Sequence, residues 1–156
     1  MTKKIINIFT DGSCHPQLNI GGWAAILLFE NEKIILKGKE INTTHNRMEL
    51  LAVIRAIEFA HEKHKNISLV IHTDSQYVFR IPERMEKLKK NNFITKKGYL
   101  LHNNDLIEAL INKIETYKIE FVKVKAHQRA ELENINYNIE VDKLARQIVR
   151  DAVYHN

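Results

Sequence analysis

The sequence predicts an α/β fold: a mixed five-stranded sheet, three antiparallel strands followed by parallel strands, flanked by helices. The first 40 residues contain three β-rich stretches separated by turn residues. Beyond them, apolar residues recur at helical spacing, and two further strand-like stretches alternate with these helices. The 156 residues contain no internal repeat and no linker long enough to divide the chain, so residues 1–156 are expected to form one domain.

The first three strands are predicted as an antiparallel meander. The apolar run that begins the chain is expected to end at Asp11, which opens a loop closed by Gly21 and Gly22. Asn31-Glu32 makes the turn between the second and third strands. The three strands are therefore expected at residues 3–10, 23–30 and 33–40.

The rest of the chain is predicted to alternate between helices and strands. Thr43 and Thr44 offer N-caps for a first amphipathic helix that runs to about residue 64. A short helix is expected after Asp74, and Pro82 is typical of the first turn of another. The remaining elements are strands at 67–74 and 118–125 and helices at 101–116 and 138–153.

The net charge of +5 is concentrated in one short segment. Residues 80–97 hold seven basic and two acidic side chains, so this segment accounts for the whole excess. A concentrated basic segment favours a nucleic-acid partner. No apolar run reaches the length of a membrane span, and the amino-terminal apolar run is too short for a signal peptide. With a single cysteine, Cys14, these features predict a cytoplasmic protein with no internal disulfide and no membrane partner.

Two of the predicted strands end in the same way. An apolar run leads into Thr-Asp-Gly at Asp11 and into Thr-Asp-Ser at Asp74. If these strands are parallel neighbours, both carboxylates emerge at one edge of the sheet. The first and last long helices carry Glu49 and Asp142 in their early turns. A lone Asp at a strand end is usually a solvated turn residue, so the prediction of a site depends on this coincidence.

Four clustered carboxylates need cations, because like charges a few ångströms apart repel strongly. Hard oxygen ligands without cysteine favour Mg²⁺ or Mn²⁺ over zinc. Two such ions, about 3.5–4 Å apart, are a common arrangement for hydrolysis of a phosphodiester. The sequence therefore predicts metal-dependent phosphodiester chemistry.

The residues that carry these acids resemble type 1 ribonuclease H, the bacterial ribonuclease HI form, over nearly the whole chain. The matching stretches are "IFTDGSC" (8–14), "GGWAAIL" (21–27), "TTHNRMEL" (43–50), "TDSQYV" (73–78) and "VDKLAR" (141–146), in the order of that family. The resemblance implies an endonuclease, active as a monomer, that hydrolyses the RNA strand of RNA–DNA hybrids and leaves 5′-phosphate and 3′-hydroxyl ends. It also implies that Asp11, Glu49, Asp74 and Asp142 bind two Mg²⁺ ions, for which Mn²⁺ can substitute.

The resemblance further implies a catalytic role for His127, in proton transfer or in the departure of product and metal. The histidine follows "VKA" at 124–126, where Ala126 stands in place of the glycine usual in the family. An imidazole suits such a role because it titrates near neutral pH.

Contacts to both strands of the hybrid are likewise implied by the resemblance. The RNA 2′-hydroxyls would be bound at Gly12, His45, Asn46 and Gln76, and a DNA phosphate at Thr44 and Asn103. The basic segment would bind the DNA strand through Lys87, Lys89, Lys90 and Phe93.

Two other functions are compatible with the same fold. One is a non-catalytic module that binds RNA–DNA hybrids, against which the presence of all four acids argues. The other is strand transfer of the transposase or integrase type, against which the short chain argues because it leaves no room for DNA-targeting domains.

Overall fold

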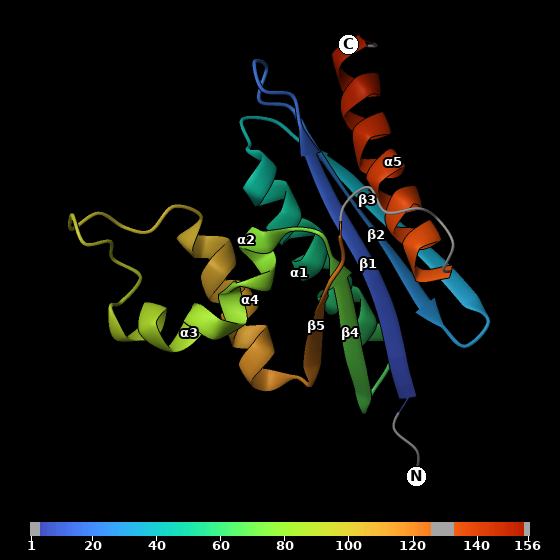
Figure 1. The fold of residues 1–156 in the computed structure, drawn as a ribbon, viewed down its shortest axis with the longest axis horizontal. Coiled ribbons are helices and arrows are strands. Elements are labelled where there is room, and N and C mark those ends of the chain that lie inside the picture. Colours follow the sequence, from blue (N-terminus) through green and yellow to red (C-terminus); the bar gives the residue numbers. More distant parts are fainter. Residues whose placement is uncertain (1–3, 126–132, 155–156) are drawn as a thin grey trace.

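The computed structural model describes residues 4–125 and 133–154. Its centre is a five-stranded sheet with the order β3-β2-β1-β4-β5 (Figure 1). The β1–β2 and β2–β3 pairs are antiparallel, and the β1–β4 and β4–β5 pairs are parallel, which confirms the predicted fold class. The strands are β1 (Lys4–Cys14), β2 (Gly21–Phe29), β3 (Glu32–Glu40), β4 (Ile67–Thr73) and β5 (Ile119–Lys123). The helices are α1 (His45–Lys63), α2 (Gln76–Phe79), α3 (Ile81–Lys90), α4 (Asn104–Thr116) and α5 (Glu133–Tyr154).

Helices cover both faces of the sheet, as the alternation of side chains along β1 requires. Ile6 and Ile8 belong to the larger core, which α1, α4 and the shorter helices complete. Phe9 points to the opposite face and packs with Val141 and Ala145 of α5. Helix α3 and the loop that follows it extend away from the sheet on the side opposite to α5 (Figure 1). Among the described residues, no helix is both long and apolar enough to cross a membrane.

Strand β1 does not end at Asp11, contrary to the prediction. It continues to Cys14, because β2 remains paired with it from Asn7–Leu28 to Cys14–Gly21. What ends near Asp11 is the parallel pairing with β4, whose last partners are Phe9 and His72. Asp11 therefore lies on an ordered strand that has a neighbour on one side only. The open side is a notch in the sheet into which side chains from other elements can reach.

Several helix boundaries also differ from the prediction. Helix α4 begins at Asn104 instead of residue 101, after Asn103 in a left-handed conformation (φ 62°). Helix α5 begins at Glu133 instead of residue 138. The start of α1 agrees with the prediction, since the Thr44 hydroxyl accepts a hydrogen bond from the Arg47 N–H at 3.2 Å.

Gly12 allows α1 to approach β1 closely. A Cβ atom at this position would lie 2.5 Å from the Glu49 backbone nitrogen and 2.6 Å from the Met48 carbonyl carbon. Both are backbone atoms, which cannot move aside as a flexible side chain can. The absence of a side chain at Gly12 therefore sets the position of Glu49 relative to Asp11.

We predict that Gly12→Ala lowers the free energy of unfolding by about 1–3 kcal/mol, the usual cost of overpacking. Urea denaturation of the variant and wild type measures the difference. Ser13→Ala, at the adjacent and half-buried position of the same strand, is the control and is expected to change stability by less than about 0.5 kcal/mol. Equal unfolding midpoints for Gly12→Ala and wild type would contradict this packing argument.

Candidate active site

Three carboxylates meet in the notch beside β1. Asp11 from β1, Glu49 from the second turn of α1 and Asp74 from the residue after β4 each offer an oxygen, and these oxygens lie within 4.8 Å of one another. Asp11 and Glu49 are only 5% and 1% exposed, whereas Asp74 is half-buried. These side chains come from three segments of the chain, as the repeated strand-end pattern predicted for two of them.

Asp142 lines the same pocket but is not one of the three clustered groups. The pocket has a volume of about 520 Å³ and also includes Ser13, Ser75 and Tyr77. Asp142 Oδ1 accepts a hydrogen bond from Arg146 Nε at 3.1 Å, one turn further along α5. The fourth predicted acid is therefore at the site, with its carboxylate paired to an arginine.

The buried carboxylates resist ionisation in this arrangement. Burial, together with the Glu49 and Asp74 carboxylates, raises the pKa of Asp11 to about 10. Burial is also the main cause that raises the pKa of Glu49 to about 8. The pKa of Asp74 is raised by burial and by Asp142, while the nearby Lys123 lowers it. Full ionisation of the cluster would place more negative charge in the site than its surroundings stabilise.

This donor set fits a hard divalent cation. All three clustered groups offer carboxylate oxygens, which Mg²⁺ and Mn²⁺ prefer. Glu49 Oε2 is buried and has no hydrogen-bond partner among the described residues, although buried acceptors are nearly always satisfied. A cation would satisfy this oxygen and offset the repulsion between the carboxylates.

The residues predicted to bind the RNA strand border this pocket. Gly12, His45, Asn46 and Gln76 all line it. His45 Nε2 lies 3.2 Å from Glu49 Oε1, so this imidazole is next to the carboxylate cluster. With its amide oxygen facing Arg80, Gln76 accepts a hydrogen bond from Arg80 Nε at 3.1 Å. His127 lies outside the described residues.

Thr44 and Asn103, predicted to bind one DNA phosphate, are connected through Arg47. The Arg47 backbone N–H donates to Thr44 Oγ1, and its guanidinium donates to Asn103 Oδ1 at 3.4 Å. The same guanidinium makes two hydrogen bonds to Asp105, at 3.0 and 2.6 Å. Asn103 Nδ2 also donates to the Tyr77 hydroxyl at 3.4 Å, which connects it to the edge of the carboxylate pocket.

The predicted basic segment lies on α3 and in the loop that follows. Lys87, Lys89 and Lys90 are all exposed in the last turn of α3. Lys89 Nζ forms an ion pair with Glu115 of α4 at 2.5 Å, so its charge is already partnered. Phe93 is half-buried against the larger core, where it holds the loop to the body of the protein.

Three basic residues at the site were not predicted from the sequence. Arg47 precedes Glu49 by two residues, and Arg146 follows Asp142 by one helical turn, a spacing that could have indicated the ion pair. Lys123 donates from Nζ to the Asp74 carbonyl oxygen at 2.7 Å. No local pattern indicates the contacts of Arg47 and Lys123, because their partners lie 49 or more residues away.

We predict that the metal-free protein becomes less stable as the pH rises from about 5 to 8. Asp11 and Glu49 have pKa values near 4 when unfolded and raised values when folded, so the folded protein binds more protons across this range. Asp11→Asn is expected to raise the free energy of unfolding in EDTA at pH 8 by at least about 1 kcal/mol, or about 2–4 °C. Thermal melts at several pH values measure both effects.

MgCl₂ is expected to stabilise wild type at pH 8 and to stabilise Asp11→Asn less. The control is Asp151→Asn, which removes an exposed acid of α5 and should leave the response to pH and Mg²⁺ unchanged. A pH-independent melting temperature in EDTA, or a less stable Asp11→Asn protein, would show that the carboxylates do not repel one another as described.

The family profile and the sequence relatives that match this chain all belong to the same family. The sequence profile of the RNase H family matches residues 3–150. A ribonuclease HI of Xylella fastidiosa (strain Temecula1) is 40% identical over 144 residues, which cover 92% of this chain and 91% of that protein. A ribonuclease H of a Wolbachia strain (wRi) is 39% identical over 153 residues, which cover 97% of this chain and 100% of that protein.

Solved structures share the fold at lower sequence identity. LC9-RNase H1, a type 1 RNase H with the type 2 active-site motif, has a TM-score of 0.80 at 21% identity and covers 96% of this chain and 74% of its own. LC11-RNase H1, solved in complex with an RNA/DNA hybrid, has a TM-score of 0.69 at 17% identity and covers 95% of this chain and 99% of its own. By its matching profile, its relatives and the carboxylates in its notch, this chain belongs to the ribonuclease H family.

Proposed function

We propose that the chain is an endonuclease that hydrolyses the RNA strand of RNA–DNA hybrids and leaves 5′-phosphate and 3′-hydroxyl ends. The observation that carries the proposal is the meeting of Asp11, Glu49 and Asp74 in a pocket that Asp142 also lines. Membership of the ribonuclease H family and the fold shared with a protein solved with an RNA/DNA hybrid support the same substrate.

The four carboxylates would hold two Mg²⁺ ions, with Mn²⁺ able to substitute. Such ions supply an activated water and neutralise the leaving oxygen of a phosphodiester. The protein contributes position: the β1–β2 ladder fixes Asp11, and α1 fixes Glu49 against Gly12. Lys123 holds the backbone at Asp74. Since each acid is anchored by a separate element, the geometry of the site is set before the substrate arrives.

The RNA strand would lie along the residues that border the pocket. The 2′-hydroxyl of RNA both donates and accepts hydrogen bonds, and so do the amides of Asn46 and Gln76 and a neutral His45 imidazole. The Gly12 backbone also borders the pocket. His127 would assist proton transfer or product departure, as its position in the sequence relative to Asp142 implies.

The DNA strand would contact the side of the molecule that carries α3 and α4. Thr44 and Asn103 would bind one phosphate, and the guanidinium of Arg47, which is paired with Asp105, lies next to Asn103. Lys87, Lys89, Lys90 and Phe93 would contact the DNA backbone further along the hybrid, with Lys89 weakened by its ion pair to Glu115. We also infer that residues 1–156 form one domain that acts as a cytoplasmic monomer.

Asp11→Asn is expected to reduce cleavage at least about 10³-fold, because it removes an anionic group from the centre of the cluster. The assay uses an RNA–DNA hybrid labelled on each strand in turn, with Mg²⁺, Mn²⁺ or EDTA. Wild type and Asp151→Asn, the matched acid-to-amide control, should cut only the RNA strand and only with a divalent ion.

The same assay distinguishes the two alternative functions. A hybrid-binding module would bind the hybrid without cutting it in any metal, and that result would overturn the proposed activity. A strand transferase would join ends of DNA and leave the RNA of the hybrid intact.

Lys87→Ala with Lys90→Ala is expected to raise KM and leave kcat nearly unchanged. These two exposed lysines would contact phosphates in a solvated setting, so their loss should also reduce the salt slope of binding by roughly 1–2. Kinetics over a range of salt concentrations measure both. Lys37→Ala with Lys39→Ala on β3 is the control, since it removes the same charge from exposed positions of another element. An equal effect of both double variants would indicate net charge alone as the cause.

A further inference from the structure

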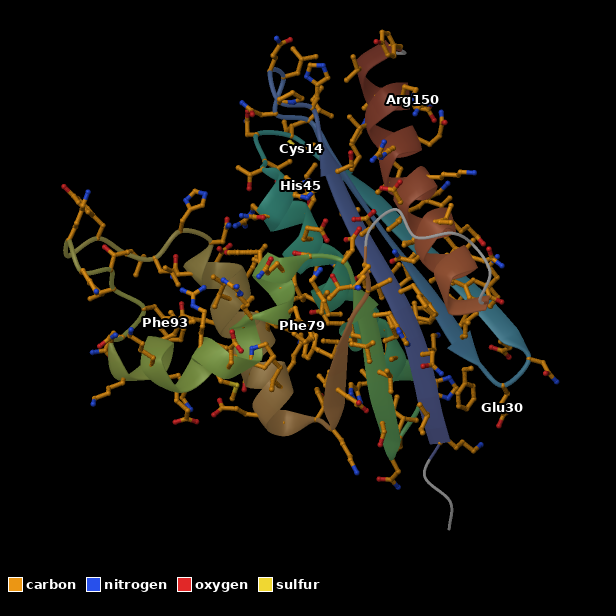
Figure 2. All side chains as sticks on the ribbon, viewed as in Figure 1. Cys14, Glu30, His45, Phe79, Phe93 and Arg150 are labelled. Carbon is orange, nitrogen blue, oxygen red and sulfur yellow. The ribbon has the colours of Figure 1, made fainter. Side chains whose placement is uncertain are left out.

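A second groove adjoins the carboxylate pocket beside α5. It has a volume of about 240 Å³ and lies between the end of β1 and the second half of α5, near Cys14 and Arg150 in Figure 2. Ser13 and Arg146 line both the groove and the carboxylate pocket, so the two adjoin at these residues. We call it the α5 groove, lined by Ser13, His15, Arg146, Val149, Arg150, Val153 and Tyr154.

The α5 groove is basic, in contrast to the acidic pocket it adjoins. Two arginines and a histidine line it, and its lining includes no acidic side chain, although Arg146 is paired with Asp142 of the adjoining pocket. Arg150 is exposed and forms no ion pair within residues 4–125 and 133–154. A solvated arginine without a protein partner can bind a phosphate through two parallel hydrogen bonds. The charge and chemistry of this groove therefore suit an anion.

His15 adds a neutral donor to the groove. Its Nδ1 accepts hydrogen bonds from the backbone N–H groups of Leu18 at 3.1 Å and Gln17 at 3.3 Å. Because Nδ1 is the acceptor, the neutral ring carries its proton on Nε2, which is then available as a donor. The loop 15–20 thus fixes the tautomer of a ring that lines the groove.

Both arginines of α5 lie close enough to the carboxylates to contact a nucleic-acid strand that leaves them. Asp142, Arg146 and Arg150 recur every four residues of α5 and so follow one side of the helix. Arg146 and Arg150 lie about 6 Å and about 12 Å along the helix axis from Asp142. These distances correspond to only a few nucleotides of a strand at ~3.4 Å of rise each. The groove is also smaller than the ~300–1,000 Å³ usual for a separate ligand.

The position of the α5 groove indicates which strand of the hybrid would lie in it. Tyr77 lines the carboxylate pocket and contacts Asn103, whereas Arg146 lines that pocket and the α5 groove. The proposed DNA contacts therefore adjoin the pocket through Tyr77, while the α5 groove adjoins it through Arg146. In Figure 1, α3 and α5 lie on opposite sides of the sheet strands that carry the acids. A strand that passes through the carboxylates and leaves along α5 is the strand that is cut.

We propose that the α5 groove binds a phosphate of the RNA strand, within a few nucleotides of the cleaved bond, through Arg150, Arg146 and His15 Nε2. This proposal rests on the proposed hydrolysis of hybrids. Arg150 and His15 are assigned as substrate-positioning residues. They increase the affinity for the RNA strand and fix its position relative to the carboxylates. They take no part in the bond cleavage itself.

The test measures coupling between Arg150 and single phosphates of the hybrid. Binding is measured with the Asp11→Asn protein, so that the substrate stays intact, using hybrids in which one phosphate at a time is replaced by an uncharged methylphosphonate. Arg150→Ala is expected to weaken binding of the unmodified hybrid by roughly 3- to 10-fold. When the neutralised phosphate is the one that Arg150 contacts, Arg150→Ala and its parent should bind the modified hybrid equally well. That phosphate should lie on the RNA strand.

Two variants distinguish a direct contact between Arg150 and phosphate from an indirect effect on the fold. Arg150→Lys should restore part of the affinity and of the coupling, and Lys143→Ala, an exposed lysine of α5 that lines neither pocket, should show no coupling at any position. Urea midpoints equal to that of the parent protein show that the fold is kept.

Each remaining outcome is decisive. If wild type cleaves the hybrid but Arg150 couples to a DNA phosphate or to no phosphate, the proposal that the α5 groove binds the RNA strand is wrong. A wild-type protein that does not cleave the hybrid would overturn the proposed function first and this inference with it.

Discussion

Repulsion between buried carboxylates is the main physical constraint on this structure, because the fold must hold these groups close together. Asp11 and Glu49 are almost fully buried, and Asp74 contributes a third oxygen within 4.8 Å. Such a cluster is stable only if protons or cations neutralise it. The fold tolerates this cost because each acid is anchored by a separate element with its own core contacts. The cluster stores an unfavourable energy that binding of divalent ions would release.

The notch in the sheet is what brings the acids together. Strand β1 continues past the last residue of β4 that pairs with it, and the continued pairing with β2 keeps Asp11 in an ordered strand. Gly12 then lets α1 approach closely enough to deliver Glu49. Helix α5 covers the other face, where Val141 packs with Phe9 directly before Asp142. A small number of backbone contacts therefore determines the distances between groups distant in the sequence.

The fold class and the convergence of the acids could be predicted from the sequence, because both depend on patterns that are local in the chain. The Thr-Asp endings of two strands and the hydrophobic spacing of α1 are such patterns. The continuation of β1 beyond Asp11 could not be predicted, since it depends on pairing with β2 across a loop. The contacts of the Arg47 guanidinium could not be predicted either, because its partners Asn103 and Asp105 lie 56 and 58 residues away.

The ion pair of Arg47 with Asp105 has a consequence for how the proposed binding regions of the two strands are joined. Two hydrogen bonds join this guanidinium to Asp105 at the start of α4, while its own backbone lies two residues before Glu49 in α1. This ion pair joins α1, which carries Glu49, to the start of α4, next to Asn103. If the two strands of a hybrid bind as proposed, the distance between Asn103 and Glu49 would determine which separation between strands fits the protein.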